Sequence, residues 1–62
     1  MINTTRREIK EAWANGDSAW EILASLVKDG WEYPDAEEAV ASALNFDEEG
    51  REMMRDGYDN NC

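Results

Sequence analysis

The sequence predicts an all-α protein, a compact bundle of three helices followed by a short fourth helix at the C-terminal end. Apolar residues recur at helical spacing along most of the chain, whereas the one alternating stretch, Trp31 to Tyr33, is too short for a strand and is closed by Pro34. The length of 62 residues allows one small domain and no more. We therefore expect a single helical domain over residues 1–62.

The first helix is expected over residues 5–15. Thr5 and Glu8 have the spacing of a capping box, in which the hydroxyl accepts from the N–H of Glu8 and the carboxylate accepts from the N–H of Thr5. Gly16 then supplies the left-handed residue that ends a helix.

The second helix is expected over residues 18–29 for the same two reasons. Ser18 and Glu21 repeat the capping-box spacing, and Gly30 provides the left-handed end. Apolar residues at helical spacing fill the segment between these two signals.

The third helix is expected over residues 35–45, because Pro34 is tolerated in a first turn and an acid is favoured there. Its apolar residues fall at i, i+3, i+4, i+7 and i+8, namely Ala36, Ala39, Val40, Ala43 and Leu44. Glu37 and Glu38 are then predicted on the outward face.

The fourth helix is expected to be short, over residues 47–56. It is predicted to turn both Met53 and Met54 toward the core and to end at Gly57. Residues 58–62 are then a polar tail. Its single cysteine, Cys62, cannot form an internal disulfide and is expected to be a reduced thiol that could at most join two chains.

The composition is strongly acidic, with 15 acids, 6 bases, a net charge of −9 and a pI near 4.1. Such a chain repels nucleic acid and anionic lipid, so neither direct nucleic-acid binding nor membrane binding is expected. No stretch approaches the about 18 apolar residues of a membrane span, and MINTTRREIK lacks the apolar segment of a signal peptide. We expect a cytoplasmic protein.

Negative charge is concentrated in the second half of the chain. Residues 29–49 contain eight carboxylates and no Lys or Arg, whereas three bases, Arg6, Arg7 and Lys10, cluster on the first helix. Each acid alone is compatible with a solvated face or a helix start. Together they predict a negative field that attracts a basic surface of another protein.

Trp31 and Tyr33 lie within this acidic stretch, on the expected connection between the second and third helices. Two readings remain open: the rings plug one end of a small core, or they form an exposed anchor with an acidic rim. Under the second reading the predicted partner-binding residues are Asp29, Trp31, Glu32, Tyr33, Asp35, Glu37, Glu38, Glu48 and Glu49.

Catalysis is not expected, so we predict no enzyme and no cofactor. The chain has no histidine to act as a base near neutral pH, and its one thiol is terminal. The acidic residues near the C-terminus lack the glycine and the later glutamate of a calcium loop, so no metal site is expected either.

The segment Gly16-Asp-Ser18-Ala-Trp-Glu21-Ile22 resembles the start of the second helix in helix-turn-helix proteins of the resolvase and sigma-factor type. The resemblance covers about half of the chain and implies a trihelical core. Asp35, Glu37 and Glu38 stand where those domains carry basic and polar residues, so the DNA contacts are not implied here.

Residues 26–44 are similar to the glycine-aromatic loop and Ala-rich helix of ubiquitin-associated domains. Asp29 replaces the methionine that usually precedes the glycine. This second resemblance also implies a compact trihelical core.

The leading hypothesis from sequence is a small acidic protein-binding module that docks on a basic surface of a partner. An inhibitor of a nucleic-acid-binding protein, encoded by a phage or mobile element and resembling DNA in charge, is the particular form we expect. The alternative is a structural homo-oligomeric or adaptor module, in which the Ala-rich face of the third helix pairs across a two-fold axis and forms a homodimer.

Overall fold

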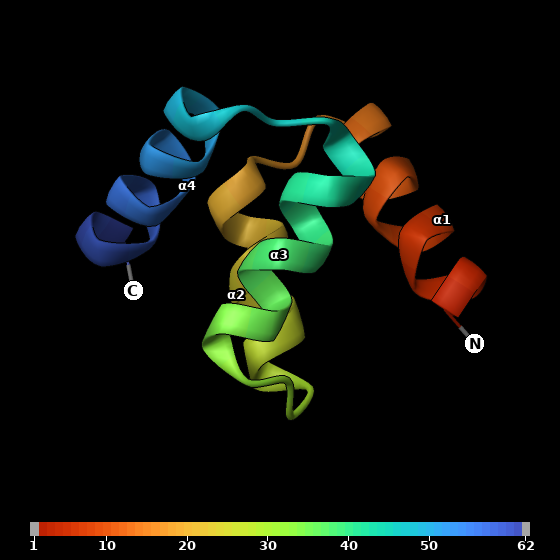
Figure 1. Cartoon of the computed structure of the whole chain (residues 1–62). Coiled ribbons are helices and arrows are strands. Elements are labelled where there is room, and N and C mark those ends of the chain that lie inside the picture. Colours follow the sequence, from red (N-terminus) through yellow and green to blue (C-terminus); the bar gives the residue numbers. More distant parts are fainter. Residues whose placement is uncertain (1, 62) are drawn as a thin grey trace.

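The computed structural model describes residues 2–61, which form four α-helices: α1 (Ile2–Ala14), α2 (Ala19–Lys28), α3 (Tyr33–Leu44) and α4 (Glu48–Asn61). This confirms the all-α prediction. Helices α2 and α3 lie side by side in the centre, and α1 and α4 flank this pair on opposite sides (Figure 1). None of the helices formed by residues 2–61 is long and apolar enough to cross a bilayer.

Three helices contribute the largest fully buried side chains, Leu23 of α2, Val40 of α3 and Met54 of α4. The Ala-rich face of α3 is buried among them, with Ala36 and Ala43 inside the core cluster. Ile9 adds a buried side chain from α1. All four helices therefore contribute to the core, and α4 does so through Met54.

Local sequence signals predict the ends of α2 well and the ends of the other helices less well. The N–H of Ser18 donates to Oε1 of Glu21 at 2.9 Å, as the capping-box spacing indicated. Thr5 lies inside α1 and cannot cap it, so the predicted start at residue 5 is wrong. Helix α3 begins at Tyr33, two residues before the predicted start, with Pro34 in its first turn.

Left-handed residues end the first three helices. Gly16 (φ 100°) and Gly30 (φ 111°) do so after α1 and α2, as predicted. After α3 the same role falls to Asn45 (φ 61°), because asparagine tolerates this conformation better than other side chains do.

Helix α4 is not short, and its predicted end at Gly57 is wrong. The helix continues through Gly57 to Asn61. A Cβ at Gly57 would lie only 2.7 Å from Cδ1 of Trp20, so glycine serves close helix packing here rather than a turn. Met54 is buried as predicted, whereas Met53 is 72% exposed. Cys62 lies outside the described residues.

Substitution of Gly57 tests this packing. Replacing glycine by alanine inside a helix normally stabilises the helix. In Gly57→Ala, however, the new Cβ would lie too close to Cβ and Cγ of Trp20, which are held near the backbone and cannot easily move away. We expect a net loss of about 1 to 2 kcal/mol in the free energy of unfolding, because overpacking outweighs helix propensity. Urea unfolding followed by circular dichroism measures it.

Asn60→Ala is the matched control, since Asn60 is exposed on the same helix. We expect it to change stability by less than about 0.5 kcal/mol. A Gly57→Ala protein more stable than the native chain would contradict the packing of α4 on Trp20.

Candidate functional site

Trp31 is positioned by the way α2 ends. The N–H of Gly30 donates to the carbonyl of Val27 at 3.1 Å, and the N–H of Trp31 donates to the carbonyl of Leu26 at 3.0 Å. This pair of bonds is a Schellman motif, in which the residue after the left-handed glycine packs back on the helix. Accordingly, Trp31 is half-buried against the core cluster.

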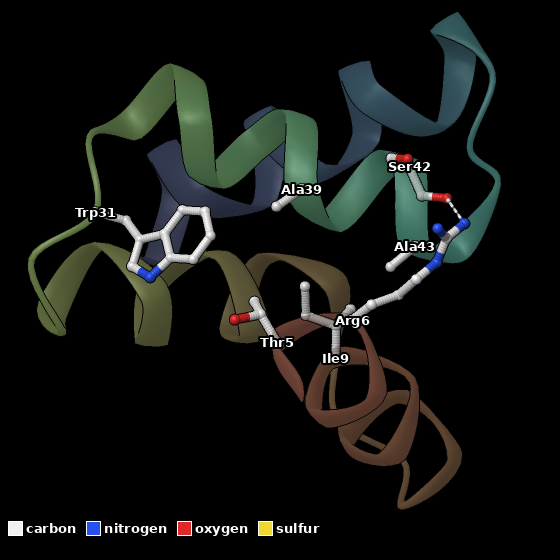
Figure 2. A pocket seen from close by; sticks show the side chains of 7 residues that line it. All are labelled: Thr5, Arg6, Ile9, Trp31, Ala39, Ser42 and Ala43. Carbon is white, nitrogen blue, oxygen red and sulfur yellow. Dashed lines mark hydrogen bonds between the residues drawn. The ribbon is translucent and has the colours of Figure 1, made fainter. Parts of the chain in front are cut away.

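Trp31 closes one end of a hollow of about 470 Å³ between α1 and α3, hereafter the apolar groove. Seven residues line it: Thr5, Arg6, Ile9, Trp31, Ala39, Ser42 and Ala43. Figure 2 shows Trp31 at one end and the Arg6 side chain at the other, where Nη2 of Arg6 lies 3.5 Å from the carbonyl oxygen of Ser42.

A second, more open hollow of about 780 Å³ shares Trp31 and Ala39 with the apolar groove. Its remaining lining consists of Gly30 and four exposed carboxylates, hereafter the acidic rim: Asp29, Glu32, Asp35 and Glu38. No Lys or Arg lines this hollow. One aromatic side chain therefore borders both the apolar groove and a hollow in which every charged lining residue is acidic.

The carboxylates of the acidic rim lack a basic partner within residues 2–61. Both ion pairs in this part of the chain converge on Glu37 instead. Glu32 occupies the N-cap position of α3, yet its side chain makes no capping hydrogen bond. The rim thus carries negative charge that these intramolecular contacts leave uncompensated.

Glu37 does not lie on the outward face, and this part of the prediction is wrong. Glu37 is only 9% exposed. Its Oε2 lies 3.2 Å from Nη1 of Arg55 and 4.0 Å from Nη1 of Arg51. A carboxylate that is mostly desolvated requires such pairing. Glu37 fastens α3 to α4, while its neighbour Glu38 is exposed on the rim.

Tyr33 also belongs to the contact between α3 and α4. Its ring packs edge-to-face on Tyr58, with centroids 5.0 Å apart. Burial raises the pKa of Tyr33, and the nearby carboxylates of Glu37 and Asp59 raise it further. Tyr33 lines neither the apolar groove nor the hollow of the acidic rim.

Glu48 and Glu49 lie in the first turn of α4. That turn is at the opposite end of α3 from the connection that carries Trp31 (Figure 1). The predicted set is therefore divided in space: Trp31 with the four rim acids, Glu37 with Tyr33 against α4, and Glu48 with Glu49 at the far end.

The α1 wall of the groove was missed by sequence reasoning. The spacing of apolar residues predicts Ala39 on the inward face of the third helix, and Arg6 stands out in the sequence only for its charge. The spacing could not show that Ala39 and Ile9 line a hollow, because α1 and α3 are far apart in sequence.

A separate apolar region lies near the end of α1. Trp13 is 46% exposed and packs edge-to-face on Phe46, with centroids 5.7 Å apart. With exposed Met53 it borders a hollow of about 380 Å³. Within residues 2–61, no group of three His, Cys, Asp or Glu side chains is arranged to hold a metal ion.

Comparison with family models, with curated proteins and with solved structures finds no match to this chain. The resemblances to helix-turn-helix and ubiquitin-associated domains stay predictions. The apolar groove and the acidic rim are therefore the features of the molecule that point to a function.

Neighbouring glutamates allow a matched test of the two faces of α3. Glu37→Gln removes the charge held by Arg55 and Arg51, whose side chains are about two-fifths exposed. We therefore expect a loss of only about 1 kcal/mol, nearer to an exposed pair than to a fully buried one. Glu38→Gln should stay within about 0.5 kcal/mol of the native value.

Urea unfolding at low and high salt measures both variants. The difference between them should shrink as salt rises, because salt screens the partly exposed arginines. Equal effects of the two substitutions would show that Glu37 does not anchor α4.

Proposed function

We propose that the protein is a small acidic binding module that docks a basic surface of a partner protein on Trp31 and the acidic rim. The observation that carries the proposal is the juxtaposition of four unpaired rim carboxylates, a half-buried tryptophan and an apolar groove. Aromatic anchors surrounded by polar rims are typical of energetic centres in protein interfaces.

The two parts of the site have different tasks in this proposal. The acidic rim attracts a basic partner and orients it, which raises the association rate. Trp31 and the groove supply desolvated apolar contact, which lowers the dissociation rate. A net charge of −9 extends the attraction beyond the site itself.

The partner class we propose is a nucleic-acid-binding protein, because its basic surface offers the matching charge. A module bound there occupies the surface that nucleic acid needs and inhibits the partner, as a DNA mimic does. The carboxylates of residues 29–49 are split between two ends of α3, so the mimicry rests on the acidic rim and not on a continuous acidic strip.

The alternative, a self-assembling module, has only part of the Ala-rich face of α3 to use. Ala36 and Val40 are fully buried within the chain, whereas Ala39 and Ala43 border the apolar groove. The exposed side chains of Trp13 and Met53 offer a second copy another apolar surface, against the repulsion of two chains of charge −9. Sedimentation equilibrium over a range of concentrations separates these cases.

Charge reversal on the rim tests the proposed function. Glu32→Lys combined with Glu38→Lys should slow association with a fluorescent Lys- and Arg-rich peptide by about tenfold, because the steering charge is inverted. Stopped-flow fluorescence at low salt gives the rate, which should fall for the native chain as salt rises.

Glu52→Lys combined with Asp56→Lys is the matched control. It changes the net charge equally, at exposed positions of α4 that line neither the groove nor the rim. We expect less than about a threefold effect on the rate. If both double variants slow association equally, the peptide responds to the net charge of the chain. The rim would then not steer association as proposed.

A further inference from the structure

We infer that the apolar groove takes one amphipathic α-helix of the partner, lying along α3 with its basic N-terminal turns at the acidic rim and its C-terminal end at Arg6. This inference rests on the proposed function and specifies its partner. It follows from the shape of the groove, from the charges at its two ends and from the backbone chemistry of its walls.

The shape of the groove suits a helix. Ala39 and Ala43 lie one helical turn apart along the α3 wall, and Thr5 and Ile9 form the α1 wall (Figure 2). Small side chains along one wall allow a helix axis to approach to the about 8 to 10 Å typical of packed helices. An apolar stripe at i, i+3, i+4 and i+7 would fill the groove as far as Trp31.

The residues that border the two ends of the groove have opposite charge. Trp31 borders the four carboxylates of the acidic rim, whereas the exposed Arg6 lines the Ser42 end. Glu48 and Glu49 lie toward the same end of α3 as Ser42, but neither lines the groove. A helix carries a partial positive charge at its N-terminus and a partial negative charge at its C-terminus. Lys and Arg in the first turns would add to the attraction at the rim, so both effects favour a helix parallel to α3.

The walls also disfavour an extended peptide. A strand gains affinity by pairing its backbone with the edge of a sheet, and residues 2–61 contain no strand. Helical walls already use their backbone groups, so an extended peptide in the groove would leave N–H and C=O groups unpaired. A helix satisfies its own backbone and brings only side chains into contact.

Three synthetic peptides of equal composition test the inference. The first has an apolar stripe, Lys and Arg in its N-terminal half and Glu in its C-terminal half. In the second peptide the two halves are exchanged. The third peptide keeps the charge layout of the first, but a proline is moved from elsewhere in the peptide to the centre of the apolar stripe. NMR titration of the ¹⁵N-labelled chain should show the first peptide binding at least about tenfold more tightly than either other peptide.

A nitroxide attached to one peptide terminus reports the direction. With the label at the N-terminus of the first peptide, we expect broadening of the amide signals of Gly30 and Glu32. With the label at the C-terminus, broadening should move to Arg6 and Ser42. The opposite pattern would overturn the parallel orientation.

Two variants tie binding to the groove. Arg6→Glu should reduce the preference for the first peptide over the second by about threefold or more, because the charge at the Ser42 end is reversed. Ala39→Leu should obstruct the groove and weaken the first peptide, while Ser25→Leu, at an exposed position outside it, should not. Circular dichroism checks that each variant remains helical.

The outcomes separate this inference from the proposed function. If all three peptides bind equally and the Glu32 and Glu38 reversal still weakens them, the acidic module stands and the helical occupant is wrong. If none of the basic peptides binds, or if reversal of the rim has no effect, both proposals fail.

Discussion

The packing of α4 on α2 and α3 is the constraint on which the rest of the structure depends. A chain of 62 residues has little apolar surface to bury, and Met54 supplies one of its three largest fully buried side chains. The buried carboxylate of Glu37 meets Arg55 along the same contact. Because one side of α3 is used in this way, only its other side is free to border α1 and the acidic rim.

The sequence was most informative where structure is decided locally. Gly16, Gly30 and the Ser18–Glu21 pair fix helix ends through the backbone conformation and hydrogen bonds of adjacent residues. Gly57 carries the same local signal but has a different cause, since its missing Cβ makes room for Trp20 of another helix. A glycine thus predicts a helix end only where no distant side chain needs the space.

The candidate site shows the same limit. Trp31 and its acidic surroundings were evident from composition, and the two readings of Trp31 turn out to be compatible, because its ring is half-buried against the core while it borders two hollows. Glu37 was misplaced since its partner Arg55 is 18 residues away. Likewise, the α1 wall of the groove depends on contacts between segments far apart in the chain, which periodicity alone does not specify.

The acidic rim carries a physical cost that helps to explain why its charge matters. Four carboxylates that line one hollow without a basic partner in the described part of the chain are expected to repel one another in the folded state. In a domain with so small a core, such repulsion is poorly tolerated unless the charge has another use. A basic ligand of the kind proposed would relieve this repulsion, and because it would bind the folded state alone it would stabilise that state by mass action. The uncompensated charge of the rim, which would lower the stability of the free domain, would therefore strengthen a complex with a basic partner.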